Sequence, residues 1–201
     1  MGKRIAVVTG ASSGMGREFL LRLDAAEKYD ELWAIARHPE KLEELRSGLR
    51  AELRPIALDL TEAESGKTYA ALLEAEQPQA AVLVNAAGYG VFGAFAERDL
   101  ENQLGIIELN DKALVRMTAL TLPYMTRGGR IYQMGSLSSF QPVPYINVYG
   151  ASKAFVLSFS RALNAELKPR GIRVMAVCPG WARGKRSRKV PTDFERTRVR
   201  R

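Results

Sequence analysis

Three side chains between residues 136 and 153 have the types and the spacing to move a proton. Tyr149 and Lys153 lie four residues apart, and side chains four apart share one face of a helix. An ammonium beside a phenol favours the phenolate and makes the phenol a stronger acid. Ser136 follows an apolar run, where a strand would end and a loop could return its hydroxyl over Tyr149. The pattern predicts a proton donor, Tyr149, beside a hydroxyl that binds a carbonyl oxygen, although an ordinary amphipathic helix can also carry Tyr and Lys at this spacing.

A glycine-rich turn near the N-terminus predicts a phosphate-binding site. Residues 3–8 form an apolar run typical of a strand, and a helical pattern with Phe19, Leu20 and Leu23 on one side follows. Glycines between them allow a tight turn and let backbone N–H groups approach a pyrophosphate, toward which the positive end of the helix points. The residues expected at this turn are Gly10, Ser12, Ser13, Gly14, Met15 and Gly16.

The second expected strand, residues 32–36, ends where nucleotide-binding sheets read the adenosine ribose. An acidic residue there accepts from the 2′-hydroxyl of NAD, whereas an arginine can pair with the 2′-phosphate of NADP. The chain has Arg37 and no acid at this point. We therefore expect NADP(H) in preference to NAD(H), although an arginine after a strand is also a common solvated loop residue.

Strands and helices alternate along the rest of the chain. Further strands are expected at residues 53–58, 80–84, 129–134 and 173–178, and helices at residues 39–49, 62–76, 100–125 and 148–167, with an interruption near Asn110. This order predicts an α/β fold with a doubly wound parallel sheet, which binds ligands at the carboxyl ends of its strands. These ends carry the glycine turn, Arg37, Asp59, residues 85–88, Ser136 and residues 179–180. Their coincidence at one edge is the strongest indication of function.

Composition limits the class of protein. The chain has 201 residues, of which 46% are hydrophobic and 26% charged, as expected of one globular domain with a full core. Its one cysteine, Cys178, excludes an internal disulfide, fits a reducing compartment and is expected to be a buried thiol. We find no leader sequence, no apolar run long enough to span a membrane and no cluster of metal ligands, and we expect the one histidine, His38, at the surface. The sequence predicts a cytoplasmic protein without a membrane partner.

The net charge of +8 is concentrated at the C-terminal end. Residues 182–201 contain nine Lys or Arg and two acidic residues, a net +7, which leaves +1 for the first 181 residues. The excess does not form a basic face on the folded part, so we expect no nucleic-acid partner. We expect a domain at residues 1–181 and a basic, largely disordered tail at residues 182–201.

In this order and spacing the motifs resemble those of the short-chain dehydrogenase/reductase family, over roughly residues 3–181. The matching residues are Thr9-Gly10-x-x-x-Gly14-x-Gly16, Asp59, Asn85-Ala86-Ala87-Gly88, Asn110, Ser136, Tyr149-x-x-x-Lys153 and Pro179-Gly180. The resemblance implies a Rossmann fold with the strand order 3-2-1-4-5-6. It also implies hydride transfer between a nicotinamide and a ketone, aldehyde or alcohol, without a metal.

The resemblance further implies a role for each matching residue. Tyr149 is expected to be the general acid/base and Lys153 to hold the nicotinamide ribose. Ser136 is expected to orient the substrate oxygen and Asn110 to anchor a water in the proton relay. The cofactor is expected to contact the glycine turn and Arg37, together with Asp59, Leu60, Asn85, Ala86, Ala87, Gly88, Tyr149, Lys153, Pro179 and Gly180.

The substrate is not identified, but the loops expected beside the nicotinamide are apolar. They carry Val91, Phe92, Phe95, Phe140, Val143 and Tyr145. This composition favours an apolar pocket, although apolar loop residues can also pack against one another.

The chain departs from the family at its C-terminal end. Family members continue with a substrate-binding helix pair and a seventh strand, whereas twenty residues follow Trp181 here. We expect the seventh strand to be missing, so that residues 173–178 form an exposed edge that lowers stability or drives association. We also expect a homo-oligomer. The alternative to an active NADP(H)-dependent oxidoreductase is a truncated nucleotide-binding protein without catalysis.

Overall fold

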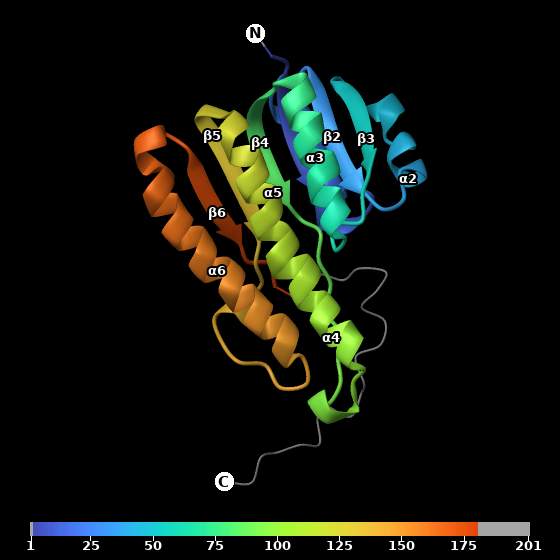
Figure 1. The fold of residues 1–201 in the computed structure, drawn as a ribbon, viewed down its shortest axis with the longest axis vertical. Helices are drawn as coiled ribbons and strands as arrows, with labels where there is room; N and C mark the ends of the chain where they lie inside the picture. Colours follow the sequence, from blue (N-terminus) through green and yellow to red (C-terminus); the bar gives the residue numbers. More distant parts are fainter. Residues whose placement is uncertain (1, 181–201) are drawn as a thin grey trace.

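A parallel sheet of six strands organises residues 2–180, the part of the chain described by the computed structural model (Figure 1). The strands lie in the order β3-β2-β1-β4-β5-β6, and every neighbouring pair is parallel. Their bounds are β1 (Arg4–Thr9), β2 (Glu31–Ala36), β3 (Glu52–Ala57), β4 (Gln79–Asn85), β5 (Met125–Met134) and β6 (Arg173–Val177). The predicted doubly wound sheet and its strand order are confirmed.

Helices cover the two faces of this sheet. The face toward the viewer in Figure 1 carries α3 (Ala63–Glu76), α5 (Ala113–Thr121) and α6 (Asn147–Leu167), and α4 (Leu100–Ile107) lies beyond the ends of the strands, in line with α5. The opposite face packs against α1 (Gly14–Ala26) and the short α2 (Glu40–Glu43). Short helical turns complete the described part: η1 (Arg46–Gly48), η2 (Phe95–Glu97), η3 (Glu108–Lys112), η4 (Leu122–Tyr124), η5 (Leu137–Ser139) and η6 (Lys168–Arg170).

Strand β1 shows how the two layers of the core arise. Ile5 and Val7 belong to the cluster that packs against α3 and α5. The alternate residues, Ala6 and Val8, belong to the cluster that packs against α1. All four side chains are 0% exposed. A strand covered on both faces needs such a continuous apolar run, which is why the sequence predicted a parallel sheet here.

The helix predicted over residues 100–125 is broken in the middle. It divides into α4, the π-helical turn η3, α5 and the 3-10 turn η4. The interruption predicted near Asn110 is therefore confirmed, and Asn110 itself is 1% exposed. β5 begins at Met125 instead of residue 129, because its pairing with β4 shifts register between Ala80 and Val82, where the β5 partner changes from Met125 to Arg130.

The helix predicted over residues 39–49 is wrong. The segment forms only α2 and η1, and Leu49 is extended. Leu42 and Leu45 are buried as their helical spacing indicated. Serine and glycine at positions 47 and 48 disfavour continuation of a helix, so burial of the leucines is achieved by short turns.

Strand β6 differs from its expected environment. Its apolar run predicts cover on both sides, yet Met175 is 55% exposed, because no described element packs over it on that face. Within residues 2–180, β6 is one of the two edges of the sheet, as predicted. Cys178 is only partly buried, which corrects the expected buried thiol, whereas His38 lies at the surface as expected. The predicted tail at residues 182–201 lies outside the described residues.

The described residues can be searched for membrane-spanning helices and for groups of metal ligands. No helix between residues 2 and 180 is both long and apolar enough to cross a membrane. In the same part of the chain, His, Cys, Asp and Glu side chains form no group of three that could hold a metal ion.

Candidate active site

Tyr149 and Lys153 lie one turn apart near the start of α6, at the carboxyl end of the sheet. The Lys153 Nζ atom is 5.5 Å from the centroid of the Tyr149 ring, so the two side chains share one volume, as their spacing predicted. The loop after β4 lies against the same ring, and a Cβ atom on Gly90 would come within 2.7 Å of Tyr149 Cδ2. A phenol and a cation therefore meet beside a loop that leaves no room for a side chain at residue 90.

Lys153 is deeply buried for a charged residue. It is 5% exposed, and its Nζ atom donates a hydrogen bond of 2.7 Å to the carbonyl oxygen of Met134 at the end of β5. Burial lowers the pKa of Lys153 to about 8, against the opposing effects of Asp111 and Cys178. The ammonium is thus held at the end of the strand that precedes Ser136.

Ser136 begins the turn that follows β5. Its Oγ atom accepts from the backbone N–H of Ser138 at 3.2 Å, and the Ser136 N–H donates to Ser139 Oγ at 3.2 Å. Ser139 Oγ donates in turn to the carbonyl oxygen of Lys153 at 2.7 Å. This reciprocal cap fixes the Ser136 turn directly to the helix that carries Tyr149 and Lys153.

Asn110 holds the loop after β4 against α6. Its Oδ1 atom accepts from the N–H of Tyr89 at 3.0 Å, and its Nδ2 atom donates to the carbonyl oxygen of Tyr89 and to Ser152 Oγ, each at 3.0 Å. A Cβ atom on Gly88 would lie 2.8 Å from Asn110 Oδ1, so only glycine fits between them. Asn110 therefore has a positioning role visible in the structure, while its expected role as a water anchor stays a prediction. Sequence reasoning missed Tyr89 and Ser152, although each adjoins a motif that it used.

The glycine turn has the shape of an anion cradle. Gly10 has a φ of +67°, and a Cβ atom there would lie 2.8 Å from the backbone nitrogen of Ala87. Gly14 has a φ of +56°, but its Cβ position has no atom within 4 Å. Ser13 is the N-cap of α1 and makes no side-chain cap, so the first N–H groups of the helix are not satisfied by that hydroxyl. An open space at uncapped helical N–H groups fits the pyrophosphate of a dinucleotide.

Two predicted cofactor contacts point their side chains into the core instead. Asn85 is 3% exposed, and its Nδ2 atom donates to Thr118 Oγ1 at 3.0 Å and to Gln133 Oε1 at 2.8 Å. Leu60 is 7% exposed and packs in the main core cluster. Only backbone atoms of these residues could face a cofactor.

The loop at Ala86 and Ala87 is tied to the glycine turn. Thr9 Oγ1 accepts from the N–H of Ala86 at 3.0 Å and from that of Ala87 at 3.1 Å. Pro179 is similarly tied to the Ser136 turn, because its carbonyl oxygen accepts from the N–H of Leu137 at 3.1 Å. The predicted motifs therefore lie along one connected edge of the sheet.

Arg37 and Asp59 lie at the ends of β2 and β3. Arg37 is exposed, and its charge acts on both Asp59 and Tyr89. Asp59 Oδ1 accepts from the N–H of Thr61 at 3.0 Å and from its hydroxyl at 2.7 Å. Burial opposes the Asp59 carboxylate, but the Thr61 bonds and Arg37 outweigh it and lower its pKa. Arg37 is thus a cation placed beside the loops of the glycine-turn edge.

The apolar residues predicted beside the nicotinamide lie on two loops that contact each other. The N–H of Gly93 donates to the carbonyl oxygen of Tyr145 at 2.8 Å, which joins the loop after β4 to the loop before α6. On these loops Phe95 is 58%, Phe140 64% and Tyr145 44% exposed. These loops thus carry aromatic side chains that are exposed to solvent.

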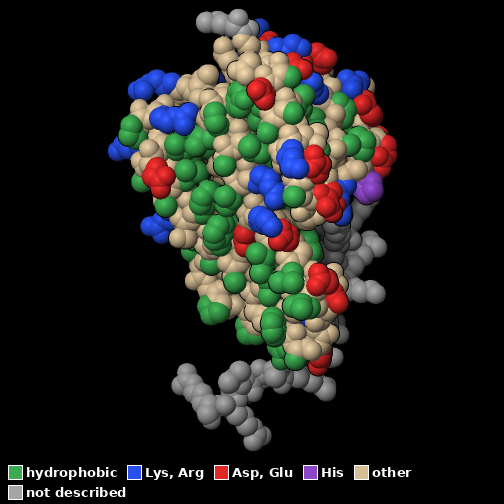
Figure 2. Space-filling model, in the orientation of Figure 1, with side chains coloured by type: hydrophobic (Ala, Val, Ile, Leu, Met, Phe, Trp, Pro, Cys, Tyr) green, Lys and Arg blue, Asp and Glu red, His purple; other side chains and the backbone are tan. Residues whose placement is uncertain are grey.

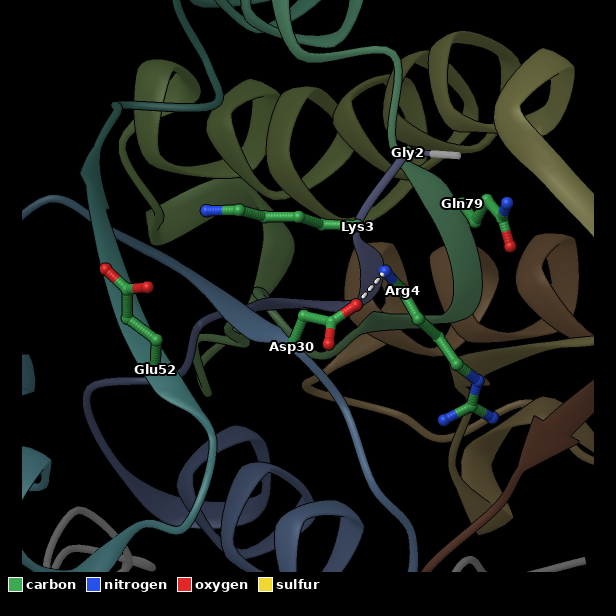
Figure 3. A pocket seen from close by; sticks show the side chains of 6 residues that line it. All are labelled: Gly2, Lys3, Arg4, Asp30, Glu52 and Gln79. Atoms are coloured by element: carbon green, nitrogen blue, oxygen red, sulfur yellow. Dashed lines mark hydrogen bonds between the residues drawn. The ribbon is translucent and has the colours of Figure 1, made fainter.

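A hollow of about 570 Å³ lies at the opposite, amino end of the sheet and carries none of these groups. Gly2, Lys3, Arg4, Asp30, Glu52 and Gln79 line it (Figure 3). Both of its cations are paired, Lys3 with Glu31 and Arg4 with Glu27, and the backbone N–H of Arg4 donates to Asp30 Oδ2 at 2.7 Å. We therefore place the candidate active site at the carboxyl end.

Solved structures with this architecture include nicotinamide-dependent enzymes. A short-chain dehydrogenase from Sphingobium yanoikuyae in complex with NADPH has a TM-score of 0.79 and 32% identity, covering 90% of this chain and 72% of that one. The bulky-bulky ketone specific alcohol dehydrogenase from Comamonas testosteroni also has a TM-score of 0.79 and 32% identity, covering 89% of this chain and 73% of that one.

Sequence relatives agree with the structural ones. The very-long-chain 3-oxoacyl-CoA reductase of Meyerozyma guilliermondii is 34% identical in an alignment 188 residues long, which covers 86% of this chain but only 54% of that reductase. The chain thus spans about half the length of this relative. The model of the short chain dehydrogenase family matches residues 4–193. With its six-stranded sheet and the motifs along its carboxyl edge, the chain belongs to the short-chain dehydrogenase family.

Proposed function

We propose that this chain is an NADP(H)-dependent oxidoreductase that reduces a ketone or aldehyde to an alcohol. The observation that carries the proposal is the shared volume of the Tyr149 ring and Lys153 Nζ, 5.5 Å apart, on the edge that also holds the glycine turn. When bound, the nicotinamide supplies or accepts the hydride. The chain's own residues then have to bind the carbonyl oxygen and deliver a proton to it.

We assign each of these tasks to one side chain. Tyr149 donates the proton to the oxygen as negative charge develops there, and Ser136 donates a hydrogen bond to the same oxygen. Lys153, whose Nζ atom lies 5.5 Å from the centroid of the Tyr149 ring, binds the nicotinamide ribose. Asn110 keeps the loop after β4 in place beside them through its bonds to Tyr89 and Ser152.

The preference for NADP(H) rests on Arg37. Its exposed guanidinium follows β2 where the adenosine ribose is read, and no acid stands at residue 36 or 38. A guanidinium binds a 2′-phosphate with charge-assisted hydrogen bonds. The related Sphingobium dehydrogenase was solved with NADPH, which supports the same preference here. NAD(H) is the weaker alternative.

The substrate we propose is an apolar carbonyl compound. The exposed Phe95, Phe140 and Tyr145 flank the site, and an apolar wall favours a substrate with apolar groups on either side of its carbonyl. The related Comamonas enzyme is specific for bulky-bulky ketones, which agrees with this class.

We also propose that copies of the chain associate through α4 and α6. Leu100, Leu104, Ile107 and Phe155 are between 42% and 60% exposed, and the rings of Phe155 and Phe159 stack at 5.8 Å. Figure 2 shows hydrophobic side chains gathered over this part of the face. Exposed apolar surface of this kind marks protein interfaces, and sedimentation of Ile107→Glu beside the wild-type protein measures its contribution.

Replacement of Tyr149 by Phe tests the proposal. We expect turnover of small ketones with NADPH to fall about 10²–10⁴-fold, because only the proton donor is removed. NADPH affinity, measured by cofactor fluorescence, should stay within a few-fold of the wild-type value. Tyr124→Phe, in η4 at the amino end of β5, is the matched control and should be fully active.

The same experiment separates the enzyme from a protein that only binds the nucleotide. If wild-type protein binds NADPH but reduces no carbonyl compound in a broad panel, the chain is catalytically silent. If Tyr149→Phe retains wild-type turnover, Tyr149 is not the proton donor.

A further inference from the structure

Asp111 has a buried oxygen that nothing in the described residues satisfies. It follows Asn110 in the π-helical turn η3, which packs against α6. Its Oδ1 atom is buried and has no hydrogen-bond partner there. An unpartnered buried carboxylate oxygen costs stability, and such exceptions are concentrated where function requires them.

The surrounding bonds bring this turn to the side of Lys153. Asn110 Nδ2 donates at 3.0 Å to Ser152 Oγ, and Ser152 immediately precedes Lys153. A Cβ atom on Gly88 would lie 2.8 Å from Asn110 Oδ1 and 3.5 Å from Lys153 Nζ. The ends of both side chains therefore reach the same small space. Asp111 adjoins it, and its charge acts on the Lys153 ammonium.

Within the described residues, Asp111 is the carboxylate that acts on Lys153. The Tyr149 ring from α6 lies 5.5 Å from the Lys153 ammonium, and the charges of Asp111 in η3 and of Cys178 after β6 act on it. Glu108, the other acid of the same turn, is paired with Lys112 at 3.0 Å. The two acids of this turn thus differ, because Glu108 forms an ion pair at the surface whereas Asp111 forms none within the described residues.

We propose that Asp111 is a positioning residue whose carboxylate is the counter-charge that keeps the Lys153 ammonium in the active site. The inference rests on the proposed function in that this ammonium would hold the nicotinamide ribose. A buried lysine without an opposing carboxylate gives up its proton closer to neutral pH. The Asp111 carboxylate and the Lys153 ammonium instead stabilise each other's charge, because burial removes the stabilisation that water would give.

The titration of the two groups defines the range in which this pair exists. Burial raises the pKa of Asp111 to about 6, against the pull of Lys153. Burial lowers the pKa of Lys153 to about 8, and Asp111 opposes that decrease. Both groups are therefore charged between about pH 6 and pH 8.

Asp111→Asn removes the charge and keeps the shape. We expect the pKa of Lys153 to fall by about one unit, as measured by NMR without cofactor on protein labelled with ¹³C at lysine Cε. The Lys153 resonance is assigned by its loss in Lys153→Met. The alkaline loss of NADPH affinity should move to lower pH by the same amount.

Two further variants control for the change. Glu108→Gln removes a negative charge from the same turn but not from the site, and it should leave the Lys153 titration unchanged. Asp111→Glu restores the charge and should return the titration toward that of the wild-type protein. An identical Lys153 titration in Asp111→Asn and in the wild-type protein would overturn the proposal.

A measurement on the wild-type protein keeps the proposal testable if Asp111→Asn does not fold. The Lys153 resonance should show a second, smaller inflection near pH 6, where Asp111 loses its proton. A single inflection would contradict the pair. Because both titrations need neither cofactor nor turnover, an inactive wild-type protein would reject the proposed function and leave the pair to be decided by NMR.

Discussion

Burial of the Lys153 ammonium, which the proposed chemistry requires, lowers the stability of the folded protein. Its pKa is about 8 in the folded protein, because burial outweighs its partners, and near 10.5 in the unfolded chain. Between these values the unfolded chain binds more protons than the folded protein, so stability rises with pH across that interval. Below about pH 8 the full cost of the buried charge is present.

We therefore expect the unfolding free energy of Lys153→Met, relative to that of the wild-type protein, to be higher at pH 7 than at pH 10. The difference in unfolding free energy between the two proteins should change by about 1–3 kcal/mol over this range. Urea unfolding at both pH values measures it, with the exposed Lys112→Met as the matched control. A difference that does not depend on pH would show that burial does not depress the lysine titration.

At the scale of elements, the start of β2 is organised by one carboxylate. Glu31 is 3% exposed, Trp33 Nε1 donates to it at 2.7 Å, and Lys3 donates to its other oxygen. Arg54 from β3 lies 3.5 Å away. Burial disfavours the carboxylate, but the bonds from Lys3 and Trp33 outweigh it and lower the pKa of Glu31. One side chain thus joins residues of β2 and β3 to Lys3, which immediately precedes β1.

Replacement of Glu31 by Gln should destabilise the protein by about 1–3 kcal/mol at pH 7, the usual worth of hydrogen bonds to a charged group. Because the Glu31 pKa is lower in the folded than in the unfolded state, this contribution is present above about pH 4.5 and is lost as the pH falls through the folded value. Denaturant unfolding at pH 7 and pH 3 measures both effects. Glu52→Gln, at the exposed start of β3, is the control; a loss for Glu31→Gln that is equal at the two pH values contradicts the assignment.

A strand or helix could be predicted where its pattern of apolar residues is compatible with only one kind of structure. β1, β2 and β4 are apolar on both faces, so their position in the centre of a parallel sheet could be read from the sequence. The segment at residues 39–49 could not, because buried leucines at helical spacing are compatible with short turns as well as with a helix. The register shift of β5 also has no signal that apolar periodicity could detect.

At the scale of the molecule, the place of the site was predictable and its contacts were not. The carboxyl ends of parallel strands meet at one edge, so Tyr149, Ser136 and the glycine turn could be brought together from topology alone. An interruption of the helix near Asn110 could be predicted, but not that the π-helical turn would place Asn110 between Tyr89 and Ser152. The inward side chain of Asn85 likewise depends on partners far along the chain, Thr118 and Gln133.

Cofactor preference should be visible in the stability of the whole protein. A ligand at 100 times its dissociation constant stabilises the folded state by about 2.7 kcal/mol, which raises the Tm of a chain of this size by about 5–10 °C. We expect NADPH to raise Tm more than NADH at equal concentration, and Arg37→Asp to reverse that order. Lys41→Asp, a nearby exposed charge reversal, is the control. An order that is the same in Arg37→Asp and in the wild-type protein would show that Arg37 is only a loop residue.

The amino and carboxyl ends of the sheet differ in how their charged side chains are paired. The amino end holds paired charges such as Glu31 with Lys3 and Glu27 with Arg4, whereas the carboxyl end holds the buried lysine and the unsatisfied carboxylate oxygen. Substitutions confined to the amino end should therefore change the thermal stability of the protein without changing its substrate range. Attachment to a solid support through that end would leave the opposite edge facing the solution.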